Sequence, residues 1–165
     1  MHWYCHEIDI RIIRDRLPQE IANLERDARQ EGHLHITRLI GDWSAGAVRF
    51  ERDGERLLAA YVAEGLAGIG GMTIEPTMSG ALRMRRFYIR PAMRRRGIGR
   101  MLALSLLDHA RPCCSIVTVH VGNDAAAKFW ESLGFQPRAR NRYSHVLELD
   151  GSGCPDGEKT LFRQP

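Results

Sequence analysis

Apolar and polar residues alternate along several short stretches of this chain and repeat at helical spacing along others. Ile8, Ile10 and Ile12 are separated by charged or polar residues, which predicts a strand. Between residues 98 and 110 the apolar residues instead gather on one helical face. The pattern predicts strands over 7–13, 57–63, 66–74, 82–89, 115–121, 135–137 and 143–149, and helices over 17–32, 98–110 and 124–133.

The order of these elements indicates the fold class. Segment 35–50 fits either a short helix or a loop with Trp43 packed inward. Glycines at 68, 70 and 71 weaken their strand, or leave room for a bulge or a close ligand. The alternation of strands with helices predicts a mixed sheet with helices on its faces, in the α/β or α+β class.

Length and composition predict a single globular domain. The chain has 165 residues, and we expect one domain over residues 1–150 and a flexible polar tail over 151–165. No apolar run approaches the roughly 20 residues that span a membrane. The N-terminus lacks the basic start and apolar stretch of a signal peptide, so we expect a cytoplasmic protein. The cysteines fit reduced thiols, or a catalytic or redox-sensing Cys113 or Cys114.

The positive charge is concentrated in one segment. A net charge of +4 suits an anionic ligand, but also non-specific nucleic acid. Nucleic-acid-binding proteins more often spread basic residues over an open face with aromatic side chains. Here they crowd around one predicted strand-to-helix junction: Arg83, Arg85, Arg86, Arg90, Arg94, Arg95, Arg96 and Arg100.

At that junction, residues 94–100 read RRRGIGR. Gly97 and Gly99 let the backbone approach a ligand, and the unpaired N–H groups of a new helix favour an anion. This combination predicts a phosphate-binding loop. A P-loop would end in Gly-Lys-Ser/Thr, and a dinucleotide fingerprint would have a third glycine at Leu102. The alternative is a solvated basic loop that caps an ordinary helix.

The spacing Arg-x-x-Gly-x-Gly resembles the pyrophosphate loop of the GNAT acetyltransferase superfamily. The preceding segment ALRMRRFYIRP (81–91) resembles the family's fourth strand, and NDAAAKFWESLGF (123–135) resembles its later helix. The order of elements over residues 7–149 also matches. The resemblance implies a mixed, mostly antiparallel twisted sheet of about six to seven strands flanked by helices. It also implies acetyl transfer from acetyl-CoA to a primary amine.

The resemblance further implies which residues hold acetyl-CoA. The loop N–H groups and arginines would bind the pyrophosphate, and the end of the 82–89 strand would pair its backbone with the pantetheine arm. A backbone N–H near Ile89 would face the thioester oxygen, and Asn123 would meet the cofactor arm, although N-capping alone also explains Asn123. The implied set is Phe87, Tyr88, Ile89, Arg94, Arg95, Arg96, Gly97, Ile98, Gly99, Arg100, Asn123, Lys128, Phe129 and Trp130, with no metal ligand.

Two positions depart from the family pattern. Trp130 stands where many members have a tyrosine that protonates the leaving thiolate, and an indole N–H does not ionise usefully. Arg83 stands where histone-acetylating relatives have a glutamate base. The acid is then Tyr143, Ser132, His120 or solvent, and the base is Glu75, Glu64, His120 acting through water, or no dedicated group.

The resemblance implies a small-molecule or peptide amine as acceptor, including a protein N-terminus or a lysine. If Arg83 or Arg86 lines its pocket, a carboxylate or phosphate on the acceptor is favoured. Otherwise these arginines pair with Glu or Asp on neighbouring strands. The rival hypotheses are a catalytically weak CoA-binding module and a basic nucleic-acid-binding protein. The resemblance also allows a homodimer and an acyl group longer than acetyl.

Overall fold

A computed structural model describes residues 7–140 and 142–149, so the predicted tail lies outside the described residues. The described part follows the predicted order of strands and helices. The elements are β1 (Asp9–Ile13), α1 (Ile21–Gln30), α2 (His35–Ser44), β2 (Arg56–Val62), β3 (Gly65–Ile74), β4 (Ala81–Ile89), a 3₁₀ turn (Pro91–Met93), α3 (Ile98–Ala110), β5 (Ile116–Val119), α4 (Asp124–Ser132), β6 (Gln136–Arg140) and β7 (Tyr143–Glu148).

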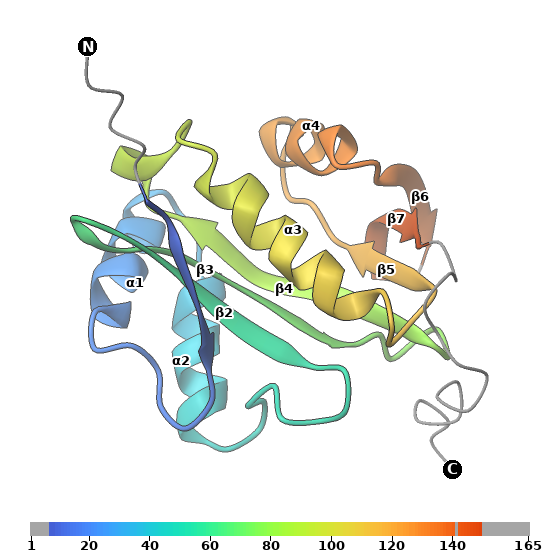
Figure 1. The fold of residues 1–165 in the computed structure, drawn as a ribbon, viewed down its shortest axis with the longest axis horizontal. Coiled ribbons are helices and arrows are strands. Elements are labelled where there is room, and N and C mark those ends of the chain that lie inside the picture. The colour runs from blue at the N-terminus through green and yellow to red at the C-terminus, as the bar shows by residue number, and fades with distance from the viewer. Residues whose placement is uncertain (1–6, 141, 150–165) are drawn as a thin grey trace. The chain divides into compact units, whose positions relative to one another are not determined.

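The strands form a seven-stranded sheet in the order β1-β2-β3-β4-β5-β7-β6. Strand β1 is antiparallel to β2, and β7 is antiparallel to both β5 and β6. Strands β4 and β5 are parallel, and helix α3 makes the crossover that a parallel pair needs (Figure 1). The predicted fold class, a mixed and mostly antiparallel sheet flanked by helices, is confirmed.

The described residues divide into two compact units. The first contains residues 7–51, 56–71 and 86–104, and the second contains the remaining described residues. Strands β3 and β4 and helix α3 each contribute residues to both units. The expectation of one domain over residues 1–150 stays a prediction.

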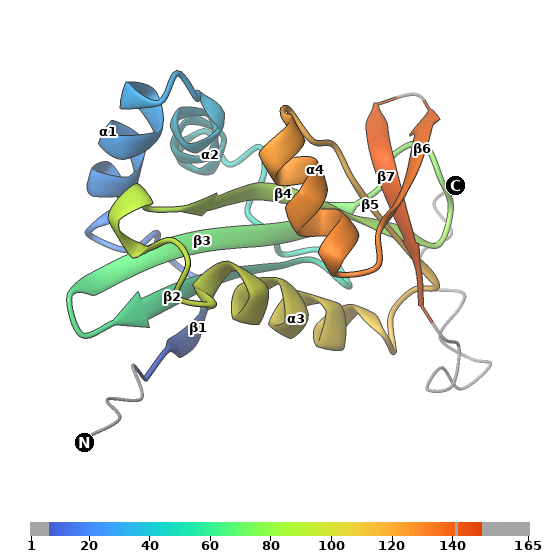
Figure 2. The same cartoon turned by 90° about the horizontal axis from the view of Figure 1, so that it is seen from above.

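The core of the first unit lies between two helices and its strands. Helices α1 and α2 cover one face of the strands, and the first part of α3 lies on the other face (Figure 2). Both helices turn an apolar stripe toward the strands, as amphipathic helices do. The buried cluster on the α1–α2 side contains Leu24, Ala28, Ile36, Leu39, Trp43, Phe50, Leu57, Ala59, Leu66, Ile69 and Tyr88.

The structure settles two uncertain segments of the sequence. Segment 35–50 contains helix α2, which confirms the helix alternative. Trp43 is buried in the core, as predicted. The first helix begins at Ile21 rather than at residue 17. The residues before it form a turn in which the Ile21 N–H donates to the Pro18 carbonyl, and the Glu20 carboxylate accepts the Leu66 N–H at 2.8 Å.

The glycines of β3 make room for neighbouring side chains. A Cβ built on Gly68, Gly70 or Gly71 would collide with a hydrophobic side chain. The neighbours are Ile89 at Gly68, Phe87 at Gly70 and Phe50 at Gly71. Close packing by the protein's own side chains, which the sequence did not predict, therefore explains these three positions, and a ligand is not needed.

Candidate functional site

The strongest candidate site in the first unit is the loop between β4 and α3. Arg95 has φ +63° and Gly97 has φ +77°, so the chain makes two left-handed steps before α3 begins at Ile98. Among the described residues, the backbone N–H groups of residues 95–100 have no backbone partner. The Met101 N–H is the first to pair, with the Gly97 carbonyl at 3.0 Å. These N–H groups and the positive end of the α3 dipole favour a bound anion.

Two arginines of this loop are held by carboxylates of the same unit. Arg94 makes a bidentate pair with Glu31, at 2.9 Å from Nη1 to Oε2 and 2.7 Å from Nη2 to Oε1. Arg96 pairs with Glu64 at 2.9 Å. Arg95 and Arg100 are exposed and make no ion pair within the described residues. The loop therefore offers two uncommitted guanidinium groups beside its N–H groups.

The predicted cofactor residues at the end of β4 lie directly before this loop. Tyr88 is buried, and its hydroxyl donates to Glu31 Oε1 at 2.5 Å. Burial and this carboxylate raise the pKa of Tyr88 well above its ordinary value, so the phenol stays protonated. The Ile89 carbonyl accepts a hydrogen bond from Arg94 Nε at 3.0 Å. Strand end, loop and α1 are therefore connected through side chains.

Sequence reasoning missed two residues that belong to this region, Glu31 and His35. Glu31 is the C-cap of α1, and His35 begins α2. His35 Nε2 lies 3.2 Å from the Phe87 carbonyl, and its ring packs edge-on against Tyr88. Burial, assisted by the neighbouring His33, lowers the pKa of His35 below its ordinary value. No local motif marks either residue, because both act on β4, more than 50 positions along the chain.

The remaining predicted cofactor residues belong to the second unit. Asn123 is the N-cap of α4, and its side-chain oxygen accepts the Ala126 N–H at 2.8 Å. Lys128 is exposed, Phe129 is half-buried, and Trp130 is buried between edge-on contacts with Phe129 and Phe135. Trp130 thus packs in a core at the position where the family pattern has its acid. The roles of these residues toward a cofactor stay predictions.

The three candidate catalytic residues lie in the second unit and differ in environment. Glu75 is 2% exposed and accepts hydrogen bonds from Thr118 and Thr77. Burial raises the pKa of Glu75, but these hydrogen bonds together lower it by more, so the pKa lies below its ordinary value. His120 is exposed just after β5, whereas Tyr143 is buried in β7. The contacts of Glu75 favour a structural role over proton transfer.

The two arginines predicted to face the acceptor have partners within the protein. Arg86 has φ +57°, a strained backbone for a residue with a side chain, and pairs with Asp42 of α2 at 3.2 Å. Arg83 donates to the Arg142 carbonyl at 2.9 Å. The alternative of an acidic partner thus holds for Arg86, although the partner lies on a helix and not on a neighbouring strand as predicted. A role in acceptor binding stays a prediction for both arginines.

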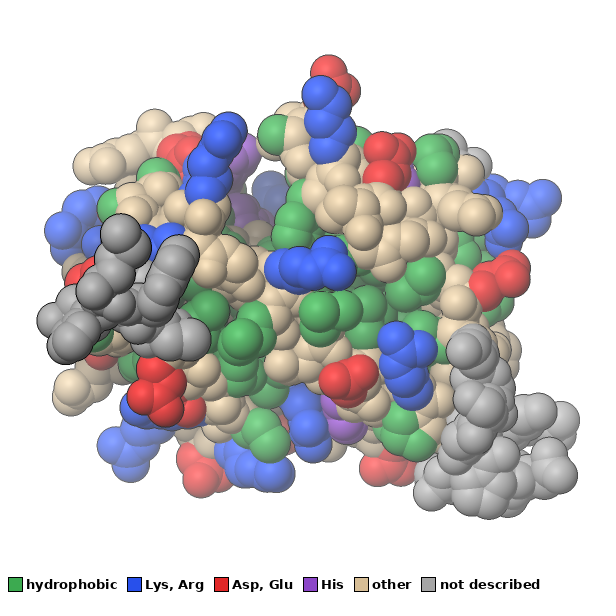
Figure 3. All heavy atoms as spheres, turned by 45° about the horizontal axis from the view of Figure 1, so that its top comes forward, with side chains coloured by type: hydrophobic (Ala, Val, Ile, Leu, Met, Phe, Trp, Pro, Cys, Tyr) green, Lys and Arg blue, Asp and Glu red, His purple; other side chains and the backbone are tan. Residues whose placement is uncertain are grey.

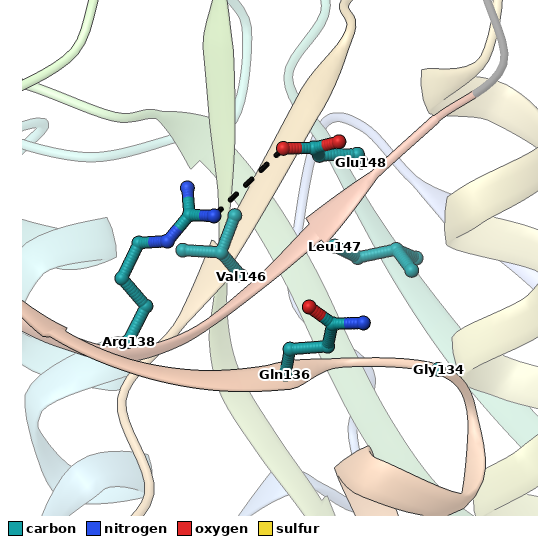
Figure 4. A pocket seen from close by; sticks show the side chains of 6 residues that line it. All are labelled: Gly134, Gln136, Arg138, Val146, Leu147 and Glu148. Atoms are coloured by element: carbon teal, nitrogen blue, oxygen red, sulfur yellow. Dashed lines mark ion pairs between the residues drawn. The ribbon is translucent and has the colours of Figure 1, made fainter.

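A small hollow of about 120 Å³ lies elsewhere in the second unit, on β6 and β7 (Figure 4). It is lined by Gly134, Gln136, Arg138, Val146, Leu147 and Glu148. Arg138 and Glu148 approach each other across it at 3.8 Å. The hollow contains none of the predicted site residues. Among the described residues there is also no cluster of three or more potential metal ligands, and no helix is long and apolar enough to cross a membrane.

Comparison with known sequences identifies relatives over most of the chain. The model of the acetyltransferase (GNAT) family matches residues 18–135. The N-alpha-acetyltransferase RimI of Mycobacterium tuberculosis is 32% identical over 145 residues, which cover 82% of this chain and 90% of that protein.

Solved structures share the fold. A protein of Exiguobacterium sp. 255-15 has a TM-score of 0.78 at 22% identity, over 86% of this chain and 93% of its own. The Escherichia coli GNAT family N-acetyltransferase YhbS, crystallised in complex with CoA, has a TM-score of 0.65 at 16% identity, over 93% of this chain and 87% of its own. These similarities support the same architecture that the strand order shows.

Proposed function

Since the chain belongs to the acetyltransferase (GNAT) family and is thus an acyltransferase, we propose a specific reaction for it. The protein transfers an acetyl group from acetyl-CoA to the α-amine of a peptide or protein N-terminus. The observation that carries the proposal is the loop at residues 94–100, in which the N–H groups of residues 95–100 have no backbone partner among the described residues and so favour a bound anion. The acceptor class is supported by the relative RimI, which is an N-alpha-acetyltransferase.

The residues present fit the diphosphate of acetyl-CoA. The open N–H groups of residues 95–100 can donate to phosphate oxygens, and Arg95 and Arg100 can add charge-assisted hydrogen bonds. Apart from its two neighbours in the chain, no described residue comes within 4 Å of a Cβ built on Gly97, so the backbone there is accessible to a ligand. The structural relative YhbS was crystallised with CoA, which supports the same cosubstrate here.

Acetyl-CoA supplies an acyl group that is already activated toward an uncharged amine. The protein's tasks are to hold the donor, to accept the amine's proton and to protonate the leaving thiolate. Glu75 is a poor proton acceptor, because its carboxylate is held by hydrogen bonds that lower its pKa. His120 is the exposed candidate for the base, and Tyr143 is the candidate for the acid.

The second candidate function is a CoA-binding module with little catalysis. The specific observation in its favour is Trp130, which occupies the position of the family's acid and is buried at 4% exposure. A buried indole N–H cannot replace a phenol as a proton donor.

The test is release of free CoA from acetyl-CoA with three kinds of acceptor. One peptide has a free N-terminus and no lysine, its matched control has a blocked N-terminus and one lysine, and the third acceptor is a free amino acid. We expect turnover with the first peptide only. Turnover with the lysine peptide or the amino acid alone would assign another acceptor class, and CoA binding without turnover on any acceptor would favour the module.

A further inference from the structure

Glu31 is a carboxylate beside a loop that is suited to bind an anion. It lies at the end of α1 and accepts hydrogen bonds from both Arg94 and Tyr88. An unpaired carboxylate here would repel phosphate. The bidentate pair with Arg94 cancels that charge, and the hydrogen bond from Arg94 is the main cause that holds the pKa of Glu31 below its ordinary value. Glu31 is therefore ionised and paired at neutral pH.

Arg94 joins Glu31 to the strained part of the loop. Its Nε donates to the Ile89 carbonyl at 3.0 Å, and its guanidinium also lies over the Tyr88 ring, 5.5 Å from the centroid. The next residue, Arg95, has φ +63°, a left-handed conformation that is unfavourable for a residue with a Cβ. Such a conformation persists when its surroundings hold it. Arg94 is thus fixed at three points directly before the left-handed step.

We propose that Glu31 is a positioning residue that acts through Arg94 to preorganise the N–H groups of residues 95–100 for the diphosphate of CoA. The proposal rests on the proposed function, because it needs CoA to be the ligand. It also assigns Arg94 a different part from the one implied by the sequence. Arg94 anchors the loop from within, and the phosphate contacts fall to Arg95, Arg100 and the backbone.

The test is a double-mutant cycle on CoA binding, measured by calorimetry with Glu31→Gln, Arg94→Gln and both changes together. We expect Glu31→Gln to raise the dissociation constant of CoA about tenfold, which corresponds to roughly 1.4 kcal/mol. The double variant should bind no more weakly than Arg94→Gln alone, because Glu31 acts only through Arg94. CoA should slow the hydrogen exchange of the amides of residues 95–100 in the wild type, and should slow it less in Glu31→Gln at the same CoA concentration.

The matched control is Glu25→Gln, which removes a carboxylate from the same helix without touching the loop; its partner is Arg29, at 3.9 Å. It should leave CoA affinity and loop exchange unchanged. The opposite mechanism makes the opposite prediction: if Glu31 only competes with phosphate for Arg94, Glu31→Gln will bind CoA more tightly. Tighter or unchanged binding, or a full additional loss in the Arg94→Gln background, would overturn the proposal. If the wild-type protein itself binds no CoA, the proposed function fails instead.

Discussion

At the scale of single residues, the tightest fit is in β3. Gly70 lies against the Phe87 ring, and a Cβ on Gly70 would approach the ring to 2.5 Å and Leu102 to 3.3 Å. Real Cβ atoms do not approach carbon so closely, so the ring would have to move. Phe87 is also one of the predicted cofactor residues. A side chain at position 70 would therefore disturb both the packing and a predicted cofactor contact near the end of β4.

We expect Gly70→Ala to lower the free energy of unfolding by about 1–3 kcal/mol, because it overpacks a filled core. Urea denaturation measures this change. Gly41→Ala is the matched control: Gly41 lies in α2 with open space around it. That control should be neutral or stabilise the protein by up to about 1 kcal/mol, since alanine is the better helix residue. Equal destabilisation by both variants would contradict the packing argument.

The lowered pKa of Glu75 should make the free energy of unfolding depend on pH. Its pKa in the folded protein lies below the ordinary value of 4.5. The stabilisation from its ionised form is therefore complete above about pH 4.5 and is lost as the pH falls through the lower folded pKa. Glu75→Gln should be less stable than wild type at pH 7 by about 1–3 kcal/mol.

The difference between wild type and Glu75→Gln should shrink below about pH 4.5, where the wild-type carboxyl becomes protonated. Denaturant unfolding at a series of pH values measures it. A difference that stays constant down to pH 3 would show that Glu75 does not titrate in this range. Glu7→Gln, a change at an exposed position, provides a control.

At the scale of elements, α4 depends on the residue that caps its start, Asn123. The Asn123 side chain accepts the Ala126 N–H, which satisfies one of the unpaired donors at the start of the helix. Asn123 is exposed, so a cofactor can also reach it. Capping and ligand binding can be separated because they require different atoms of the same amide.

Asn123→Ala should destabilise the protein by about 1 kcal/mol through loss of the cap, whereas Asn123→Asp should keep the cap and the stability. Thermal unfolding measures this effect. If the amide also donates to CoA, Asn123→Asp will bind CoA more weakly despite its normal stability. Wild-type affinity in that variant would leave Asn123 as a cap alone.

At the scale of the whole molecule, the basic charge is partly neutralised. Of the arginines that crowd the junction, Arg86, Arg90, Arg94 and Arg96 each pair with a carboxylate. On the face shown in Figure 3, basic side chains lie among acidic and apolar ones. This distribution disfavours non-specific binding to nucleic acid.

If acetyl-CoA is the ligand, it binds the folded state and stabilises it. At about 100 times its dissociation constant it should stabilise the protein by about 2.7 kcal/mol and raise the melting temperature by roughly 5–10 °C. A DNA duplex at the same concentration, in 150 mM salt, should cause no comparable shift. A larger shift with DNA, falling steeply as salt is added, would support the nucleic-acid hypothesis.

The sequence predicted the features that depend on neighbouring residues. Helix α3 begins and ends where its apolar spacing and flanking glycine and proline indicated, and Asn123 caps α4 as its residue type suggested. The pairing of Arg94 with Glu31 could not be predicted, because 63 positions separate the two residues and only the packing of α1 beside β4 joins them. The same holds for the β3 glycines, whose neighbours come from other elements.

The contact between Gly70 and Phe87 finally implies that these two positions share one fixed volume. A methyl group gained at 70 has to be offset by atoms lost at 87. Gly70→Ala combined with Phe87→Leu should therefore recover stability that neither change permits alone. A larger residue at position 70 is therefore tolerated only together with a smaller residue at position 87, so the two positions must change together if β4 is to end in the same conformation.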